Sequence, residues 1–298
     1  MVDFRIIEYA ALGFLVNFVY IVLVSLRYKY LLHVMKEKIS LLHASCLFCV
    51  YQAVTYLDPL KIGGVVAKPV ATRLLAKTSL RNAFLATAFE QVFDFIWQIP
   101  LVILAVLYFG NALFSAVNGA QLWLIGGAVV FGILVAIFFQ QILNFFLQKI
   151  IPKKLRKMQT FRNENFLSVK KEILLLFKSP SRVGMMFLIT AVFVLFSPFL
   201  LLVALAGFNA GISYGAAFLA YWVSFSVGRL SGIPGGFGSR DVTLLGMLVY
   251  FGIASGVALK AILLYRMITL IPNLLVGGGI LLYYGGKYGF KIFSKEES

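Results

Sequence analysis

The chain has 298 residues, of which 61% are hydrophobic and 13% charged, and its formal net charge is +16. A soluble domain carries about 25% charged residues, so this composition excludes a soluble globular protein and indicates a polytopic all-α membrane protein. Because no soluble module is present to carry the basic residues, we interpret them as cytoplasmic loops beside anionic lipid and expect no binding of nucleic acid.

Seven apolar runs are long enough to be membrane spans, since a crossing takes about 20 residues. In chain order they are 6–26, 39–57, 82–109, 121–147, 183–206, 213–230 and 258–284. Two shorter segments, 61–76 and 241–253, follow glycine-rich breaks, and we expect them to be re-entrant or discontinuous helices. The basic insert 149–182 mixes apolar and cationic residues, which favours an amphipathic helix on an anionic leaflet, with a solvated linker as the alternative.

The order of these segments predicts a single membrane domain, 1–298, that contains a repeat. The halves 6–109 and 183–284 each read span, span, glycine break, span, with nearly the same spacing to the break. The positive-inside rule places the basic clusters in the cytoplasm, so the N-terminus is expected outside and the C-terminus inside. In this topology the halves run in opposite directions, which is the inverted-repeat architecture of many transporters.

The two glycine breaks are the strongest functional signal. They are Asp58-Pro59-Leu60-Lys61-Ile62-Gly63-Gly64 and Pro234-Gly235-Gly236-Phe237-Gly238-Ser239-Arg240-Asp241. Unwound backbone at membrane depth is tolerated only where protein buries it or where it lines a cavity. We therefore expect the breaks to face each other, and we expect the helix starts behind them to offer N–H groups to a phosphate. The candidate phosphate ligands are Lys61, Lys68, Arg73, Arg229 and Arg240.

The few acidic residues of the apolar regions mark the same place. Glu90 and Asp94 lie one turn apart and share a helix face, and such charges cost about 2.5–3.5 kcal/mol each at the bilayer centre unless they meet a cavity or a cation. Arg266 holds the corresponding position in the second half, so a Glu90–Arg266 pair is expected, either functional or only structural. A competing interpretation pairs Arg240 with Asp241 or Asp94.

Other site classes are disfavoured. His33 and His43 have no cysteine or carboxylate at ligand spacing, so no metal is expected, and Cys46 and Cys49 lie in an apolar run where we expect ordinary core residues. No nucleotide-binding motif is present, so no cofactor is expected and transport would be passive or gradient-driven. No histidine lies near a break and no catalytic pairing stands out, so we expect no enzymatic activity.

Four blocks carry a family resemblance. The chain resembles the transmembrane-region family of lysylphosphatidylglycerol synthases, which includes membrane domains attached to archaeal dolichyl-phosphate glycosyltransferases. The blocks are the two breaks, Leu26-Arg27-Tyr28, and Phe89-Glu90-Gln91-Val92-Phe93-Asp94, with Tyr265-Arg266 as a later match. Gly64, Gln91 and Asp241 depart from the family pattern, which has an acid, an arginine and a glutamate there.

The resemblance implies a lipid-handling membrane domain, because in the synthases this region is taken to move the aminoacylated lipid between leaflets. Neither an aminoacyl-transfer domain nor a glycosyltransferase domain is recognised in this sequence, so a stand-alone translocase-type domain is expected. The residues expected to bind the head group are Lys61, Gly63, Gly64, Glu90, Asp94, Arg229, Gly235, Gly236, Arg240, Asp241 and Arg266.

The leading interpretation is a cell-membrane flippase or scramblase for an anionic phospholipid or a polyprenyl-phosphate-linked lipid. Two alternatives stay open. One is a non-transporting, lipid-binding partner of a membrane-bound synthase or glycosyltransferase. The other is an ion-coupled solute carrier.

Overall fold

The computed structural model describes residues 4–58, 63–116 and 179–284, and this part of the chain is helical with no strand. Within it, three helices are long and apolar enough to cross a membrane: Phe4–Val34, Pro180–Ala206 and Ser255–Tyr284. The predicted class, an all-α helical membrane protein, is confirmed. Contacts divide the chain into two units, residues 1–102 with 179–298 and residues 103–178. Apart from the end of α4 (Leu80–Ala116), the elements and contacts below belong to the first unit.

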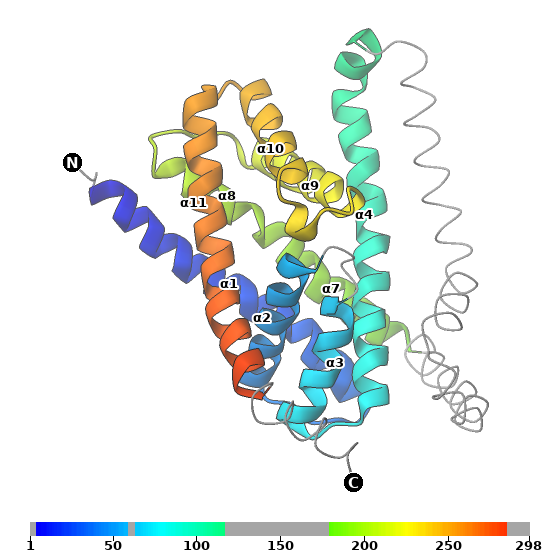
Figure 1. Ribbon diagram of the computed structural model, residues 1–298. Helices are drawn as coiled ribbons and strands as arrows, with labels where there is room; N and C mark the ends of the chain where they lie inside the picture. The colour runs from blue at the N-terminus through cyan, green and yellow to red at the C-terminus, as the bar shows by residue number, and fades with distance from the viewer. Residues whose placement is uncertain (1–3, 59–62, 117–178, 285–298) are drawn as a thin grey trace. The chain divides into compact units, whose positions relative to one another are not determined.

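The described residues of the first half, 4–58 and 63–116, form four helices (Figure 1). They are α1 (Phe4–Val34), α2 (Leu41–Leu57), α3 (Gly63–Ala76) and α4 (Leu80–Ala116). Ser40 begins α2 as its N-cap, because its hydroxyl accepts the N–H of His43 at 3.1 Å. The predicted span 121–147 and most of the basic insert lie outside the described residues.

The first break is described only at its edges, since residues 59–62 lie outside the described part. Asp58 Oδ2 accepts the N–H of Gly63 at 2.5 Å, and this carboxylate satisfies one of the unpaired donors at the start of α3. A Cβ on Gly64 would lie 2.2 Å from Thr55 Oγ1 and 2.9 Å from the Tyr51 carbonyl oxygen. Glycine at this position therefore lets α3 pack closely on α2.

The second half contains the matching elements (Figure 1). They are α7 (Pro180–Phe196), α8 (Pro198–Ala206), α9 (Tyr214–Leu230), η2 (Pro234–Gly236), α10 (Ser239–Tyr250), α11 (Ser255–Asn273) and η3 (Leu274–Gly278). Pro198 has no N–H to donate, which accounts for the interruption between α7 and α8. The short helices predicted at 61–76 and 241–253 are found as α3 and α10. The repeat and its inverted orientation stay predictions.

Left-handed glycines shape the second break. Gly235, Gly236 and Gly238 have φ angles of 57°, 66° and 80°, a region that other residues rarely adopt. A Cβ on Gly236 would also lie 3.2 Å from the Cα of Gly228 in α9. The turn between α9 and α10 therefore requires glycine both for its backbone conformation and for close packing.

The apolar core joins the two halves. One buried cluster combines residues of α1, α2 and α4 with residues of α7 to α11; among its fully buried members are Leu200, Leu201, Leu248 and Ile268. Many large apolar side chains are exposed instead, such as Leu15 and Leu188. Exposed apolar side chains around a buried core suit a bundle whose outer surface meets lipid.

Several hydroxyl groups bond within their own helix. Each donates to the carbonyl four residues earlier, which satisfies it without a partner helix. They are Ser25, Thr55, Thr87, Thr190, Thr243 and Thr269, at 2.6–2.9 Å.

Gly277 in η3 packs directly against the backbone of α2, and we expect Gly277→Ala to be destabilising. The added Cβ would lie 2.2 Å from the Cys49 carbonyl oxygen, so the helices must separate; overpacking of this kind costs about 1–3 kcal/mol. Gly278→Ala is the matched control, because a Cβ there meets nothing within 4 Å. Thermal unfolding in detergent measures both variants, and equal midpoints would contradict the close approach.

Candidate functional site

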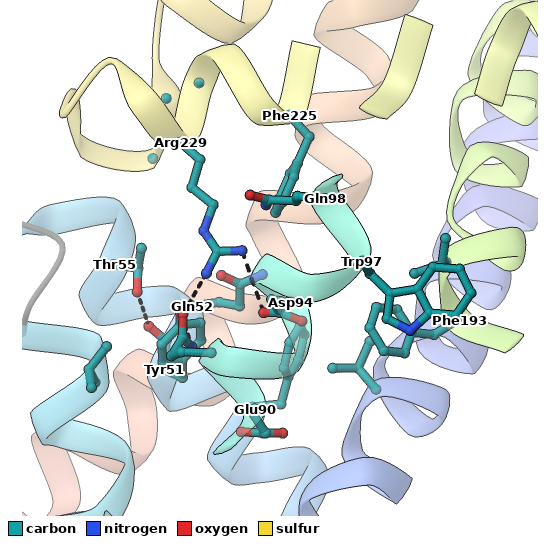
Figure 2. A pocket seen from close by; sticks show the side chains of 18 of the residues that line it. Tyr51, Gln52, Thr55, Glu90, Asp94, Trp97, Gln98, Phe193, Phe225 and Arg229 are labelled. Atoms are coloured by element: carbon teal, nitrogen blue, oxygen red, sulfur yellow. Dashed lines mark hydrogen bonds and ion pairs between the residues drawn. The ribbon is translucent and has the colours of Figure 1, made fainter. Parts of the chain in front are cut away.

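A cavity of about 200 Å³ is formed by both halves of the chain. Residues of α1, α2, α3 and α4 line it together with residues of α7, α9, η2 and α10 (Figure 2). Its charged lining residues are Arg27, Lys68, Glu90, Asp94, Arg229 and Arg240. A single water needs about 10–15 Å³ of such volume, so the cavity has room for a head group.

Glu90 holds two cations at one side of the cavity. Lys68 Nζ donates to Glu90 Oε2, and Arg27 Nε lies 3.7 Å from Glu90 Oε1. The three side chains are at most 4% exposed. The ammonium group of Lys68 also lies 3.9 Å from the centre of the Tyr28 ring. The carboxylate therefore neutralises charges from α1 and α3 that would otherwise be stranded in a dry interior.

Asp94, one turn further along α4, links the two halves. Arg27 Nη1 of α1 donates to Asp94 Oδ1 at 2.6 Å, and Arg229 Nη1 of α9 lies 3.5 Å from Asp94 Oδ2. Figure 2 shows Arg229 reaching from its helix toward Asp94. Arg229 Nη2 also donates to Gln91 Oε1 at 2.5 Å. One carboxylate thus bridges the first and second halves across the cavity.

Arg240 is held differently. Its guanidinium lies 5.2–5.3 Å from the centres of three rings, those of Tyr221, Phe225 and Tyr265, and Nη2 donates to the Tyr265 hydroxyl at 2.5 Å. The residue is 9% exposed, and no carboxylate of the described residues forms an ion pair with it within 4 Å. The pairing of Arg240 with Asp241 or Asp94 is therefore not found.

The predicted Glu90–Arg266 pair is wrong. Arg266 Nε donates to Asp241 Oδ1 at 2.7 Å, and its two terminal nitrogens donate to the carbonyls of Gly235 and Gly236 at 3.2 and 3.4 Å. Glu90 has its partners in α1 and α3 instead. Matching positions in two repeats do not determine which side chains face each other, and Glu90 and Arg266 both have their ion-pair partners within their own half.

The two breaks approach each other on their described sides. The Tyr56 ring at the end of α2 lies 6.1 Å from the Phe237 ring, and a Cβ on Gly235 would lie 2.6 Å from Tyr56 Cδ1. We expected the first turns of α3 and α10 to offer free N–H groups to a phosphate. In the structure, a carboxylate already accepts one N–H at the start of each helix. Asp58 accepts from Gly63, and Asp241 Oδ2 accepts the Gly238 N–H at 3.1 Å.

The structure sorts the predicted site residues into three groups. Those that line the cavity are Glu90, Asp94, Arg229, Gly235, Gly236 and Arg240. Those described but outside its lining are Gly63, Gly64, Asp241 and Arg266, which shape the breaks. Lys61 lies outside the described residues.

Sequence reasoning missed Arg27 and the ring cage around Arg240. Arg27 lies at the end of the first apolar run and belongs to a family-like block, which was a usable signal. Tyr221, Phe225 and Tyr265 carried no such signal, since aromatic residues in apolar spans are usually lipid-facing or core residues.

The fold and the cavity define a helical membrane protein with a buried, ionised site between its halves. A family model described as lysylphosphatidylglycerol synthase TM region matches residues 4–277, so the chain belongs to this family. No curated protein matches the chain.

Proposed function

We propose that this protein is a membrane lipid translocase of the flippase or scramblase type, which binds the head-group phosphate of an anionic phospholipid or a polyprenyl-phosphate-linked lipid. The observation that carries the proposal is the cavity itself, where four cations meet two carboxylates. Buried charges inside a helical membrane protein are costly and usually mark a pathway or binding site. Their placement between two halves that each contain a broken segment is typical of transporter sites.

In this proposal the phosphate enters beside Arg229 and Arg240 while the acyl or prenyl chains stay in the surrounding lipid. Arg229 is suited to this role because its planar fork can bind two phosphate oxygens at once. The protein acts in the cell membrane with its N-terminus outside and its C-terminus in the cytoplasm, and it catalyses no covalent step.

Reconstitution in liposomes tests the proposal. Purified protein is added to vesicles that contain a trace of fluorescent anionic lipid, and a membrane-impermeant quencher reports which leaflet the lipid occupies. We expect faster exchange between leaflets than in protein-free vesicles. Binding without exchange would support a lipid-binding partner of a synthase or glycosyltransferase, and gradient-dependent solute uptake without lipid movement would support a solute carrier.

We expect Arg229→Gln to slow this lipid exchange by roughly tenfold, the loss expected for one charge-assisted hydrogen bond. The variant should fold, because Asp94 keeps its contact with Arg27 at 2.6 Å. Lys260→Gln is the matched control: Lys260 is exposed and does not line the cavity. Equal exchange by the wild-type protein and Arg229→Gln would remove Arg229 from the pathway.

A further inference from the structure

We infer that the cavity selects lipids whose head group is a phosphomonoester over phosphodiester lipids and over lipids with a cationic head group. This inference rests on the proposed function and names its substrate class. It starts from charge: the described lining residues include four cations, Arg27, Lys68, Arg229 and Arg240, and two carboxylates, Glu90 and Asp94. Two positive charges are therefore left over, which matches an anion that carries two negative charges.

The unused hydrogen-bonding groups point the same way. Five buried polar atoms of lining residues have no hydrogen-bond partner in the described part of the chain. Two of them, Arg27 Nε and Glu90 Oε1, form an ion pair with each other at 3.7 Å. The remaining three are all nitrogen donors; they are Trp97 Nε1, Gln98 Nε2 and Arg240 Nε. Buried polar groups usually find partners, so this excess of donors calls for a ligand rich in acceptor oxygens. A phosphomonoester presents three such oxygens.

Arg240 supplies the second, independent observation. Its side chain is more than nine-tenths buried, its Nε has no partner, and it reaches the cavity from the start of α10. Aromatic faces stabilise a guanidinium, but a carboxylate or phosphate is needed to neutralise it. The surplus charge of the cavity is therefore concentrated at Arg240, close to the glycine break.

Among the described lining residues, no carboxylate is left to pair with a cationic head group. Glu90 is held by Lys68 and Arg27, and Asp94 by Arg27 and Arg229. An ammonium group that entered would have to displace one of these cations and would add to an existing positive surplus. The cavity thus disfavours an aminoacylated phospholipid on charge alone.

Lipid binding by the full chain in detergent tests the inference. Three lipids with identical acyl chains serve as probes: phosphatidic acid, phosphatidylglycerol and lysylphosphatidylglycerol. The measurement is made at pH 8.5, where a phosphomonoester carries close to two charges because its second pKa is about 6. Inorganic phosphate is the fourth probe, which separates a lipid head group from free phosphate.

We expect phosphatidic acid to bind at least roughly tenfold more tightly than phosphatidylglycerol, the gain expected for one extra charge-assisted hydrogen bond, and lysylphosphatidylglycerol to bind most weakly. Equal affinities, or tighter binding of lysylphosphatidylglycerol, would overturn the inference. So would inorganic phosphate binding as tightly as phosphatidic acid. If lipid exchange is seen in liposomes without this affinity ranking, the translocase proposal stands and only the selectivity inference fails. If the protein shows no lipid binding and no lipid exchange, both proposals are refuted.

The variant Arg240→Gln tests whether this residue causes the preference for the phosphomonoester. It should bring the affinity for phosphatidic acid down to that for phosphatidylglycerol, while the thermal midpoint without lipid stays unchanged or rises because a buried, uncompensated charge is removed. Lys260→Gln should keep the wild-type ranking. A retained preference in Arg240→Gln would contradict the assignment of this residue, and the wild-type ranking decides the inference even if a variant fails to fold.

Discussion

Glu90→Gln is expected to lower the free energy of unfolding by about 3–5 kcal/mol, the usual cost of removing one partner from a buried ion pair. Glutamine cannot neutralise Lys68, whose side chain is only 4% exposed and whose ammonium group is bound to the Glu90 carboxylate. Arg27 would lose one of its two anionic neighbours at the same time. The stranded charges, rather than the lost hydrogen bond, account for most of the effect.

A double-mutant cycle with Lys68→Met separates these contributions. The double variant should be milder than the sum of the single changes, with a coupling of about 0.5–3 kcal/mol. Denaturant unfolding in micelles gives the free energies. Glu8→Gln is the control, because it removes the same charge at an exposed position of α1. Strict additivity would mean that Lys68 and Glu90 are not coupled.

Arg266→Gln is expected to cost about 1.5–3 kcal/mol, the range for hydrogen bonds to charged groups. Arg266 holds the Asp241 carboxylate and the carbonyls of Gly235 and Gly236, so its loss frees the left-handed turn. The cost stays below that of Glu90→Gln because the Asp241 side chain is 27% exposed and can be partly hydrated. The same thermal and denaturant measurements apply.

Arg266→Lys distinguishes charge from geometry at this position. Lysine keeps the charge but has no planar fork to reach a carboxylate and two carbonyls together, so most of the destabilisation should remain. Lys260→Gln on the same helix should be neutral, as exposed charges contribute little. Full recovery of stability by Arg266→Lys would show that charge alone matters there.

The sequence was informative about properties that depend only on neighbouring residues along the chain. Long apolar runs predicted the spans, and glycine clusters predicted the short helices α3 and α10, because length and backbone freedom are local properties. The importance of Glu90 and Asp94 followed from the cost of placing carboxylates among apolar residues. Both line the cavity.

Pairing could not be predicted in the same way. Glu90 meets Lys68 rather than Arg266 because the rotation of each helix, which the sequence does not specify, decides which side chains face each other. The ring cage of Arg240 depends likewise on aromatic residues of two other helices. The sequence makes Lys68 a candidate phosphate ligand, and only its burial beside Glu90 distinguishes it from exposed lysines.

The serine and threonine hydroxyls that bond one turn back along their own helices have a mechanical consequence. Each of these bonds survives when its helix slides or rotates against a neighbour, because both atoms move together. Resistance to sliding therefore comes mainly from the interlocking of side chains and from ionic contacts between helices, chiefly those of Glu90, Asp94 and Asp241. The ionic resistance to sliding is thus concentrated at a few carboxylates, and it is joined by hydrogen bonds between helices, such as those from Asn17 Nδ2 to the Ile268 carbonyl and between the Tyr28 and Thr72 hydroxyls.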